Sequence, residues 1–225
     1  MKTATIEAVI LGHKNFGEKD KLIFFYTPEF GKIKVIAKGS RRINSKFTGH
    51  LETLSIVQAS IYFGPRNIIL TEINSTERIR PKNTLSNLKS ALQIAEITNK
   101  LIQEEQTNEN LHLLLQEAIN LLTTTDKPQI ITYAYIIKLL DQLGSLPDFR
   151  EIRTNLPEKF SKFFNYVKQA PLSEIECITL DHKEATIVEN FILKALQFTF
   201  DLNFSSLETF KTPRTLSNLS NNKSN

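Results

Sequence analysis

Six basic side chains lie between residues 32 and 46, with no acidic residue among them. Such a group binds phosphate oxygens through Coulomb attraction and counterion release, without reading bases. Gly39 frees the backbone within the group, and Ser40 and Ser45 can donate hydrogen bonds to phosphate. The sequence therefore predicts a strand and loop that bind a phosphodiester backbone. The expected contact residues are Lys32, Lys34, Lys38, Arg41, Arg42, Lys46 and the adjoining Phe47.

Aromatic side chains elsewhere in the first 64 residues are candidates for stacking on unpaired bases, which contributes about 1–3 kcal/mol per base. They are Phe16, Tyr62 and Phe63. A second interpretation is that the basic residues are solvated side chains on an edge strand, where they prevent that edge from pairing with a strand of another molecule. The absence of acids favours binding, because a surface that is only kept soluble usually mixes both signs of charge.

Catalytic and metal-binding patterns are weak in this sequence. The single cysteine, Cys177, excludes an internal disulfide and a zinc site of four thiolates, and its spacing to Asp181 and His182 is a poor ligand pattern. The chain has no phosphate loop, nucleophile elbow or zinc-protease helix. Glu29 and Glu52 are the only acids expected near the basic residues. We therefore expect no enzymatic activity, metal or cofactor, and a metal-dependent nuclease is the least favoured alternative.

The basic residues lie in a segment rich in turns, since six of the seven glycines fall within the first 64 residues. Frequent turns leave room only for short strands, which must therefore position the basic residues. Apolar and β-branched runs predict strands over residues 5–13, 21–27, 31–38, 51–63 and 67–74. Alternation within residues 31–38 places Lys32 and Lys34 together on one face of their strand. Five short strands in about 75 residues predict an OB-fold β-barrel, with an SH3-like barrel or a small sandwich as the alternatives.

Helical spacing replaces the strand pattern after Pro81. It predicts helices over residues 84–104, 108–122, 128–144, 158–168 and 184–200. The apolar positions of the first helix are Leu85, Leu88, Leu92, Ala95 and Leu101, which we expect to form its buried stripe. The third helix is apolar nearly all round, and we expect it to form the core.

The charge divides at the same place. Residues 1–80 hold 13 basic and 7 acidic side chains, a net charge of +6, whereas the remainder holds 15 and 17, a net of −2. We therefore expect an α+β chain with an OB-fold domain over residues 1–80, an α-helical domain over 81–211 and a disordered tail over 212–225. Glu7 interrupts what would be a signal peptide's apolar core, so we expect a cytoplasmic protein without a membrane partner.

Ordered motifs in the first 46 residues resemble the N-terminal half of the bacterial DNA repair protein RecO family. They are residues 8–11 (AVIL), 16–22 (FGEKDKL), 26–32 (YTPEFGK), 37–42 (AKGSRR) and 45–46 (SK). Residues 138–148 (KLLDQLGSLPD) are similar to that family's central helix and its exit. The resemblance implies an OB-fold on a helical domain, and a recombination mediator that is not an enzyme.

The same resemblance implies partners. A RecO protein binds single- and double-stranded DNA, anneals complementary strands and, with RecR, helps to load RecA onto DNA coated by the single-stranded-DNA-binding protein. By position, Lys38, Arg41, Arg42 and Lys46 would contact DNA, and the helical half would take the C-terminal tail of the single-stranded-DNA-binding protein. The protein would then be associated with the nucleoid. An RNA-binding OB-fold protein is the alternative.

One departure from the family pattern concerns zinc. Many members carry a four-cysteine zinc module after the Leu-Gly-x-x-Pro stretch, whereas residues 148–154 contain no cysteine. We therefore expect residues 148–183 to be a degenerate, metal-free form of this module, irregular apart from one short helix near residues 158–168.

Overall fold

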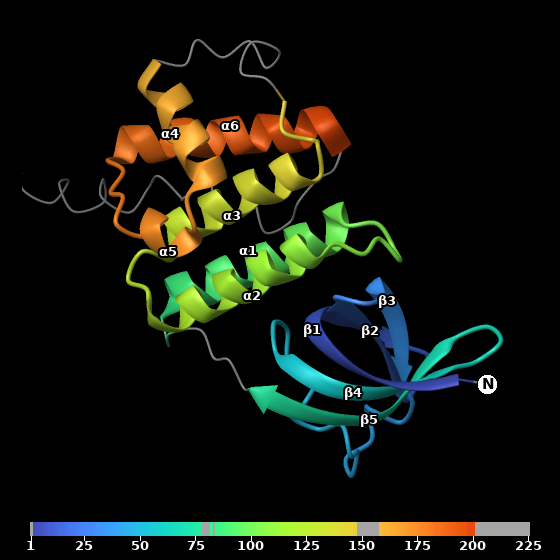
Figure 1. The fold of residues 1–225 in the computed structure, drawn as a ribbon. Coiled ribbons are helices and arrows are strands. Elements are labelled where there is room, and N and C mark those ends of the chain that lie inside the picture. Colours follow the sequence, from blue (N-terminus) through green and yellow to red (C-terminus); the bar gives the residue numbers. More distant parts are fainter. Residues whose placement is uncertain (1, 78–81, 83, 148–157, 201–225) are drawn as a thin grey trace, which may run out of the picture.

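The computed structural model describes residues 2–77, 82, 84–147 and 158–200 of the 225-residue chain. In these ranges five strands precede six helices (Figure 1). The expected disorder of residues 212–225, the expected domain boundary at residues 80–81 and the cysteine-free residues 148–154 lie outside the described residues.

The N-terminal strands close into a barrel in the order β1-β2-β3-β5-β4. Their bounds are β1 (Lys2–Phe16), β2 (Asp20–Thr27), β3 (Gly31–Ala37), β4 (Ile56–Phe63) and β5 (Ile68–Glu77). β3 and β5 pair in parallel, with Val35 beside Ile68, and the other pairs are antiparallel. The five predicted strands are confirmed, and the closed five-stranded barrel fits the OB-fold rather than a small sandwich.

Strand β1 is longer than predicted because it serves two neighbours. Its first half, from Lys2 to Val9, pairs with β4, and its second half pairs with β2. The register shifts between Ile10 and Gly12. A bulge at this point bends the strand and increases its twist, which lets one strand close the barrel from both sides.

The barrel interior is filled by alternate side chains of all five strands. Phe47 and Leu51, from the loop between β3 and β4, belong to the same buried cluster. The strand residues of this cluster are Ile6, Ala8, Ile10, Ile23, Phe25, Ile33, Val35, Ala37, Val57, Ala59, Ile61, Leu70 and Ile73.

The helices begin where the sequence predicts. Their bounds are α1 (Leu85–Leu101), α2 (Glu109–Thr124), α3 (Pro128–Gln142), α4 (Glu158–Gln169), α5 (Leu172–Ile175) and α6 (His182–Phe200). Thr84 caps α1 by accepting a hydrogen bond from the Asn87 amide at 3.1 Å, and Asn108 caps α2 in the same way. The short helix α5 was not predicted, because four residues carry too little periodicity.

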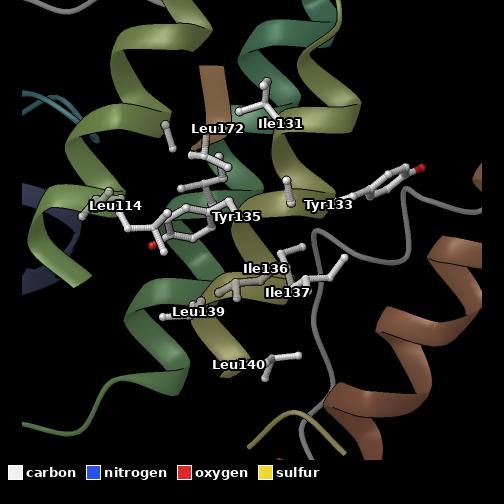
Figure 2. Packing of buried hydrophobic residues seen from close by; sticks show 14 of the residues in the cluster. Leu114, Ile131, Tyr133, Tyr135, Ile136, Ile137, Leu139, Leu140 and Leu172 are labelled. Carbon is white, nitrogen blue, oxygen red and sulfur yellow. The ribbon is translucent and has the colours of Figure 1, made fainter. Parts of the chain in front are cut away.

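Helix α3 is the centre of the helical domain, as its all-round apolar sequence predicts. It packs against α1, α2, α4, α5 and α6. Figure 2 shows Leu114 of α2 and Leu172 of α5 beside the buried residues of α3, within one apolar cluster. The hydroxyl groups of Tyr135 and Thr98 share a hydrogen bond of 2.6 Å, which satisfies both polar groups inside this core.

The face that α1 buries differs from the prediction. Ala95 and Leu101 are buried as predicted, but Leu85, Leu88 and Leu92 are 84%, 50% and 49% exposed, so the first half of the expected stripe faces outward. Asn87 is buried instead, because its side-chain amide donates to the Leu122 carbonyl at 3.1 Å and to the Thr125 carbonyl at 3.0 Å. These bonds satisfy the carbonyl groups at the end of α2 and fix the rotation of α1.

The barrel and the helices share a core. Val9, Leu11, Tyr26, Leu54 and Ile56 of the barrel region belong to the helical apolar cluster. The Tyr26 hydroxyl also donates to the Asn108 carbonyl at 3.1 Å, and burial raises the pKa of Tyr26 to about 12. None of the helices in the described ranges is long and apolar enough to cross a membrane.

His112 lies in this contact between the barrel and the helices. It is 4% exposed, and in the described part of the chain neither ring nitrogen has a hydrogen-bond partner. Its Nε2 atom is 3.7 Å from the Glu7 carboxylate, and its ring centroid is 6.0 Å from that of Tyr26. Burial lowers the pKa of His112 below 6.5, although Glu7 and Glu29 act in the opposite direction.

We expect stability to fall on the acid side because His112 is held neutral. Below about pH 6.5 the unfolded chain protonates this residue before the folded protein does, so the contribution of His112 is complete above that pH and is lost below it. The melting temperature should therefore decrease between pH 7 and pH 5, and His112→Leu should flatten this decrease. His182→Gln, at the exposed start of α6, is the control; an unchanged slope in His112→Leu would contradict the assignment.

Candidate nucleic-acid interface

The two cations on β3 contact the helical domain. Lys32 is 9% exposed, and its Nζ atom donates to the Asn99 carbonyl in the last turn of α1 at 2.6 Å. A cation at this position satisfies a terminal carbonyl and complements the helix dipole. Burial lowers the pKa of Lys32; Glu104 acts in the opposite direction, and the adjacent Lys34 in the same direction as burial. The Lys32 ammonium is therefore committed to the end of α1.

Lys34 forms an ion pair with Glu104 in the loop between α1 and α2. The Glu105 amide in that loop donates to the Lys32 carbonyl at 3.0 Å, so the loop follows the outer side of β3. The expectation that Glu29 and Glu52 are the only acids near the basic residues is wrong. Glu104 is far away in sequence, and only the packing of the helices against the barrel brings it to Lys34.

Phe47 points into the barrel rather than toward a ligand. Its side chain is 3% exposed and belongs to the barrel core. The Lys46 Nζ atom lies 5.4 Å from the ring centroid, a cation–π contact at the loop surface. Phe47 thus anchors the loop that carries Lys46, and its ring is covered in this conformation.

The loop after β3 is held in shape by successive turns. The Arg42 amide donates to the Gly39 carbonyl and the Ser45 amide to the Arg42 carbonyl, both at 3.1 Å. Lys38, Arg42 and Lys46 are exposed on this loop. An ordered loop presents its cations in a defined arrangement, which lowers the entropy lost when a phosphate backbone binds.

The same loop is attached to the hairpin between β1 and β2. The Gly39 amide donates to the Asp20 carboxylate at 2.7 Å. Arg41 donates from its guanidinium to the Gly17 carbonyl at 3.2 Å and to the Glu18 carbonyl at 2.9 Å. Arg41 therefore joins the loop to the hairpin as well as contributing positive charge.

This attachment gathers cations that are separate in sequence. Lys21 pairs with Ala37 in the sheet, and the Arg41 amide donates to the Lys19 carbonyl at 3.0 Å. The hairpin cations are not among the predicted contact residues, because they lie outside the segment without acids. We call the combined group the basic hairpin–loop surface; its members are Lys19, Lys21, Lys38, Arg41, Arg42 and Lys46.

A cleft of about 440 Å³ lies on the outer side of β3. The turn between β4 and β5, residues 64–67, forms one wall, and the loop between α1 and α2 forms another. OB-folds bind oligonucleotides on the face of strands 2 and 3 and at the loops that follow strands 1 and 4. The cleft occupies this position, and Arg66 at its wall was not singled out from the sequence.

Metal-ligating groups do not gather here or elsewhere in the described ranges. No three His, Cys, Asp or Glu side chains of these ranges are placed to hold a metal ion. The spacing of Cys177 to Asp181 has a structural explanation, because Asp181 opens α6. Its carboxylate accepts from the Glu184 amide at 2.8 Å, and the Glu184 carboxylate accepts from the Asp181 amide at 3.0 Å, which is a capping box.

Comparisons with known proteins agree with this architecture. The family models Recombination protein O N terminal and Recombination protein O C terminal match residues 1–82 and 82–209. The chain belongs to the RecO family. Membership places it among proteins of DNA repair and recombination, and confirms the family resemblance of the N-terminal motifs.

Curated relatives named DNA repair protein RecO match different lengths of the chain. The protein of Thermoanaerobacter sp. (strain X514) is 25% identical over 215 residues, which cover 94% of this chain and 85% of the relative. That of Thermodesulfovibrio yellowstonii is 32% identical over 161 residues, 68% of this chain and 64% of the relative. The Roseiflexus sp. (strain RS-1) protein is 29% identical over 146 residues, 64% of this chain and 51% of the relative.

The ion pair between Lys34 and Glu104 gives a testable prediction for this RecO-family protein. We expect Glu104→Gln to tighten DNA binding about 5- to 10-fold at 0.1 M salt, because Lys34 is released to a phosphate and adds about 0.9 to the salt slope. Glu105→Gln is the matched control, since it removes the same charge from the same loop. Anisotropy titrations at several salt concentrations measure both, and equal effects in the two variants would contradict a specific role of Lys34.

Proposed function

We propose that this protein binds single- and double-stranded DNA through the basic hairpin–loop surface and anneals complementary strands. The observation that carries the proposal is the attachment of the loop to the β1–β2 hairpin by Gly39 and Arg41, which brings the hairpin cations Lys19 and Lys21 close to the cations of the loop. In the described part of the chain none of the six residues of the basic hairpin–loop surface forms an ion pair with a carboxylate. Their charge is therefore available to phosphate groups.

Annealing follows from the same physics. Two complementary strands repel each other through their phosphates, and a cationic surface that binds both lowers this repulsion and raises their local concentration. No acid, base or metal is required at any step. We therefore propose a mediator rather than an enzyme, which acts where DNA is concentrated, at the nucleoid.

Family membership supports the same partners for this chain. We propose that it acts with RecR to assist RecA loading, and that its helical domain binds the C-terminal tail of the single-stranded-DNA-binding protein. An annealing assay on DNA coated with that protein, with and without its tail, tests this part. Annealing that is independent of the tail would contradict a direct contact.

The central experiment measures binding of labelled single-stranded and duplex DNA by fluorescence anisotropy across a range of salt concentrations. If the four loop cations bind phosphates, the log–log slope should be about −3.6 on duplex and about −2.8 on single strands. Annealing of complementary strands is followed in the same samples. An absence of DNA binding would overturn the proposal.

Two further outcomes would favour the alternative functions. Competition by RNA of matched sequence that greatly exceeds competition by DNA would indicate an RNA-binding protein, which needs contacts to the 2′-hydroxyl. Cleavage of DNA by the purified protein with magnesium or manganese would indicate a nuclease.

A further inference from the structure

The cleft beside β3 differs in chemistry from the basic hairpin–loop surface. We propose that it takes one unpaired base of a single strand, with the Phe16 ring stacked on the base and the Arg66 guanidinium on a flanking phosphate. A single strand thereby gains contacts that a duplex cannot make. This inference rests on the proposed DNA binding and names the part of the site that distinguishes the two kinds of DNA.

The size and lining of the cleft suit a base. Its volume of about 440 Å³ lies within the range of pockets that hold small ligands, about 300–1,000 Å³. Leu22 and Ile36 supply apolar surface, and they lie opposite each other on β2 and β3. The Phe16 side chain remains 45% exposed at the end of β1. A half-exposed aromatic ring next to aliphatic groups can serve as a platform for stacking.

The other two aromatic candidates are less available. Phe63 packs against Phe30, with their ring centroids 5.3 Å apart, and lies against the barrel core. Tyr62 is half-buried, and its ring lies beneath Gly64 of the β4–β5 turn. Phe16 is therefore the exposed aromatic among the three candidates, and it is the one that lines the cleft.

The charges beside the cleft suit a phosphate next to the base. Arg66 is exposed on the β4–β5 turn and pairs with no carboxylate in the described ranges. Lys34 lies at the other wall, where Glu104 neutralises it. Arg66 thus supplies a net positive charge on one side of the cleft, while the opposite wall is close to neutral.

The cleft is continuous with the proposed path of the DNA backbone. Phe16 pairs with Asp20 at the end of the hairpin, and the Asp20 carboxylate accepts from the Gly39 amide. Lys38 precedes Gly39, so Phe16 lies between the loop cations and the cleft. A strand bound along the loop would therefore pass the opening, and only an unpaired base can turn into it, because paired bases are enclosed within the duplex.

A single tryptophan reports on this contact directly. The chain contains no tryptophan, so Phe16→Trp introduces the only one. We expect a thymidine oligonucleotide to quench its fluorescence and a duplex of equal length to leave it nearly unchanged. Tyr166→Trp is the matched control, because Tyr166 on α4 is also 45% exposed but lies in the helical domain. Quenching of the tryptophan in both variants, or in neither, would overturn the inference.

Two substitutions that each remove a proposed DNA contact test the base-binding cleft without a fluorescent reporter. Phe16→Ala should weaken single-strand binding about 5- to 100-fold and leave duplex binding within about twofold. Arg66→Gln should weaken single-strand binding by a smaller factor and reduce the salt slope by about 0.7. Equal losses on single strands and duplex in Phe16→Ala would overturn the subsite, and thermal melts check that both variants fold.

Failure of this inference is distinguishable from failure of the proposed function. Anisotropy of labelled DNA reports binding at any part of the surface, whereas the tryptophan fluorescence of the Phe16→Trp variant reports only the cleft. Binding by anisotropy without quenching would leave the basic hairpin–loop surface in place and remove the base subsite. No binding by either measurement would remove both.

Discussion

Simultaneous replacement of Lys38, Arg42 and Lys46 by glutamine should weaken duplex binding by more than about 100-fold at 0.1 M salt. Each lost phosphate contact removes about 0.9 from the log–log salt slope, so the slope should become shallower by about 2.7. The thermal melt should change little, because the three side chains are exposed and their described contact with the fold is the cation–π contact of Lys46 with Phe47, which contributes about 0.5–1 kcal/mol. Anisotropy titrations and melting curves measure the two effects.

Arg41 is left out of this triple variant for a structural reason. Its guanidinium bonds to the Gly17 and Glu18 carbonyls, so its replacement would loosen the hairpin as well as remove charge. Glutamine is preferred to glutamate because it removes attraction without adding repulsion. The measured loss then reports the phosphate contacts themselves.

The matched control removes three charges from the helical domain. Lys162→Gln on α4, combined with Lys183→Gln and Lys194→Gln on α6, lowers the net charge by the same amount. If binding depended only on net charge, the two triple variants would lose affinity equally. That result would contradict the assignment of the basic hairpin–loop surface, as would unchanged affinity in a folded Lys38/Arg42/Lys46 variant.

Patterns that depend on neighbouring residues are what the sequence predicts well. Thr84 and Asn108 are recognisable as helix caps because a cap needs only a side-chain oxygen and a free backbone amide three residues further along the chain. Helix α3 is recognisable as the core from its composition alone. The five strands follow from β-branched runs bounded by turn residues, and the closed barrel follows from their number and length.

Predictions that depend on packing between distant segments are less secure. Lys32 and Lys34 resemble free cations in the sequence, but α1 and the loop after it supply their partners from about 70 residues away. Leu88 resembles a core residue, yet Asn87 takes the buried position because the carbonyls of Leu122 and Thr125 need a donor. Neither outcome is encoded in the periodicity of a single element.

The basic residues of β3 and of the loop that follows it therefore have two different roles. Its charges at Lys32 and Lys34 attach the barrel to the helical domain, and the charges that follow in the loop remain on the surface. Both depend on the chain reversal at Gly31, which brings β3 against the loop between α1 and α2. The absence of a side chain at Gly31 thus lets the backbone of Gln106 approach β3 closely.

Gly31→Ala should lower the free energy of unfolding by about 3 kcal/mol or more. Gly31 has a φ angle of +62°, where an L side chain costs about 1–2 kcal/mol. An added Cβ would also overlap the backbone of Gln106, and backbone cannot move aside as a flexible side chain does. The loop would have to shift away from β3, which would break the hydrogen bond between the Glu105 amide and the Lys32 carbonyl.

Gly17→Ala is the control that separates the cost of backbone strain at positive φ from the cost of the overlap with Gln106. Gly17 has a nearly identical φ of +60°, but a Cβ there would meet no atom within 4 Å. We therefore expect Gly17→Ala to cost only the backbone strain, about 1–2 kcal/mol, and Gly31→Ala to lower the melting temperature by several degrees more. Equal melting temperatures in the two variants would contradict this expectation, because they would show that the backbone of Gln106 moves aside without cost. A larger loss at Gly31 would mean that the loop between α1 and α2 is fixed against β3 and cannot move aside for a Cβ without loss of stability.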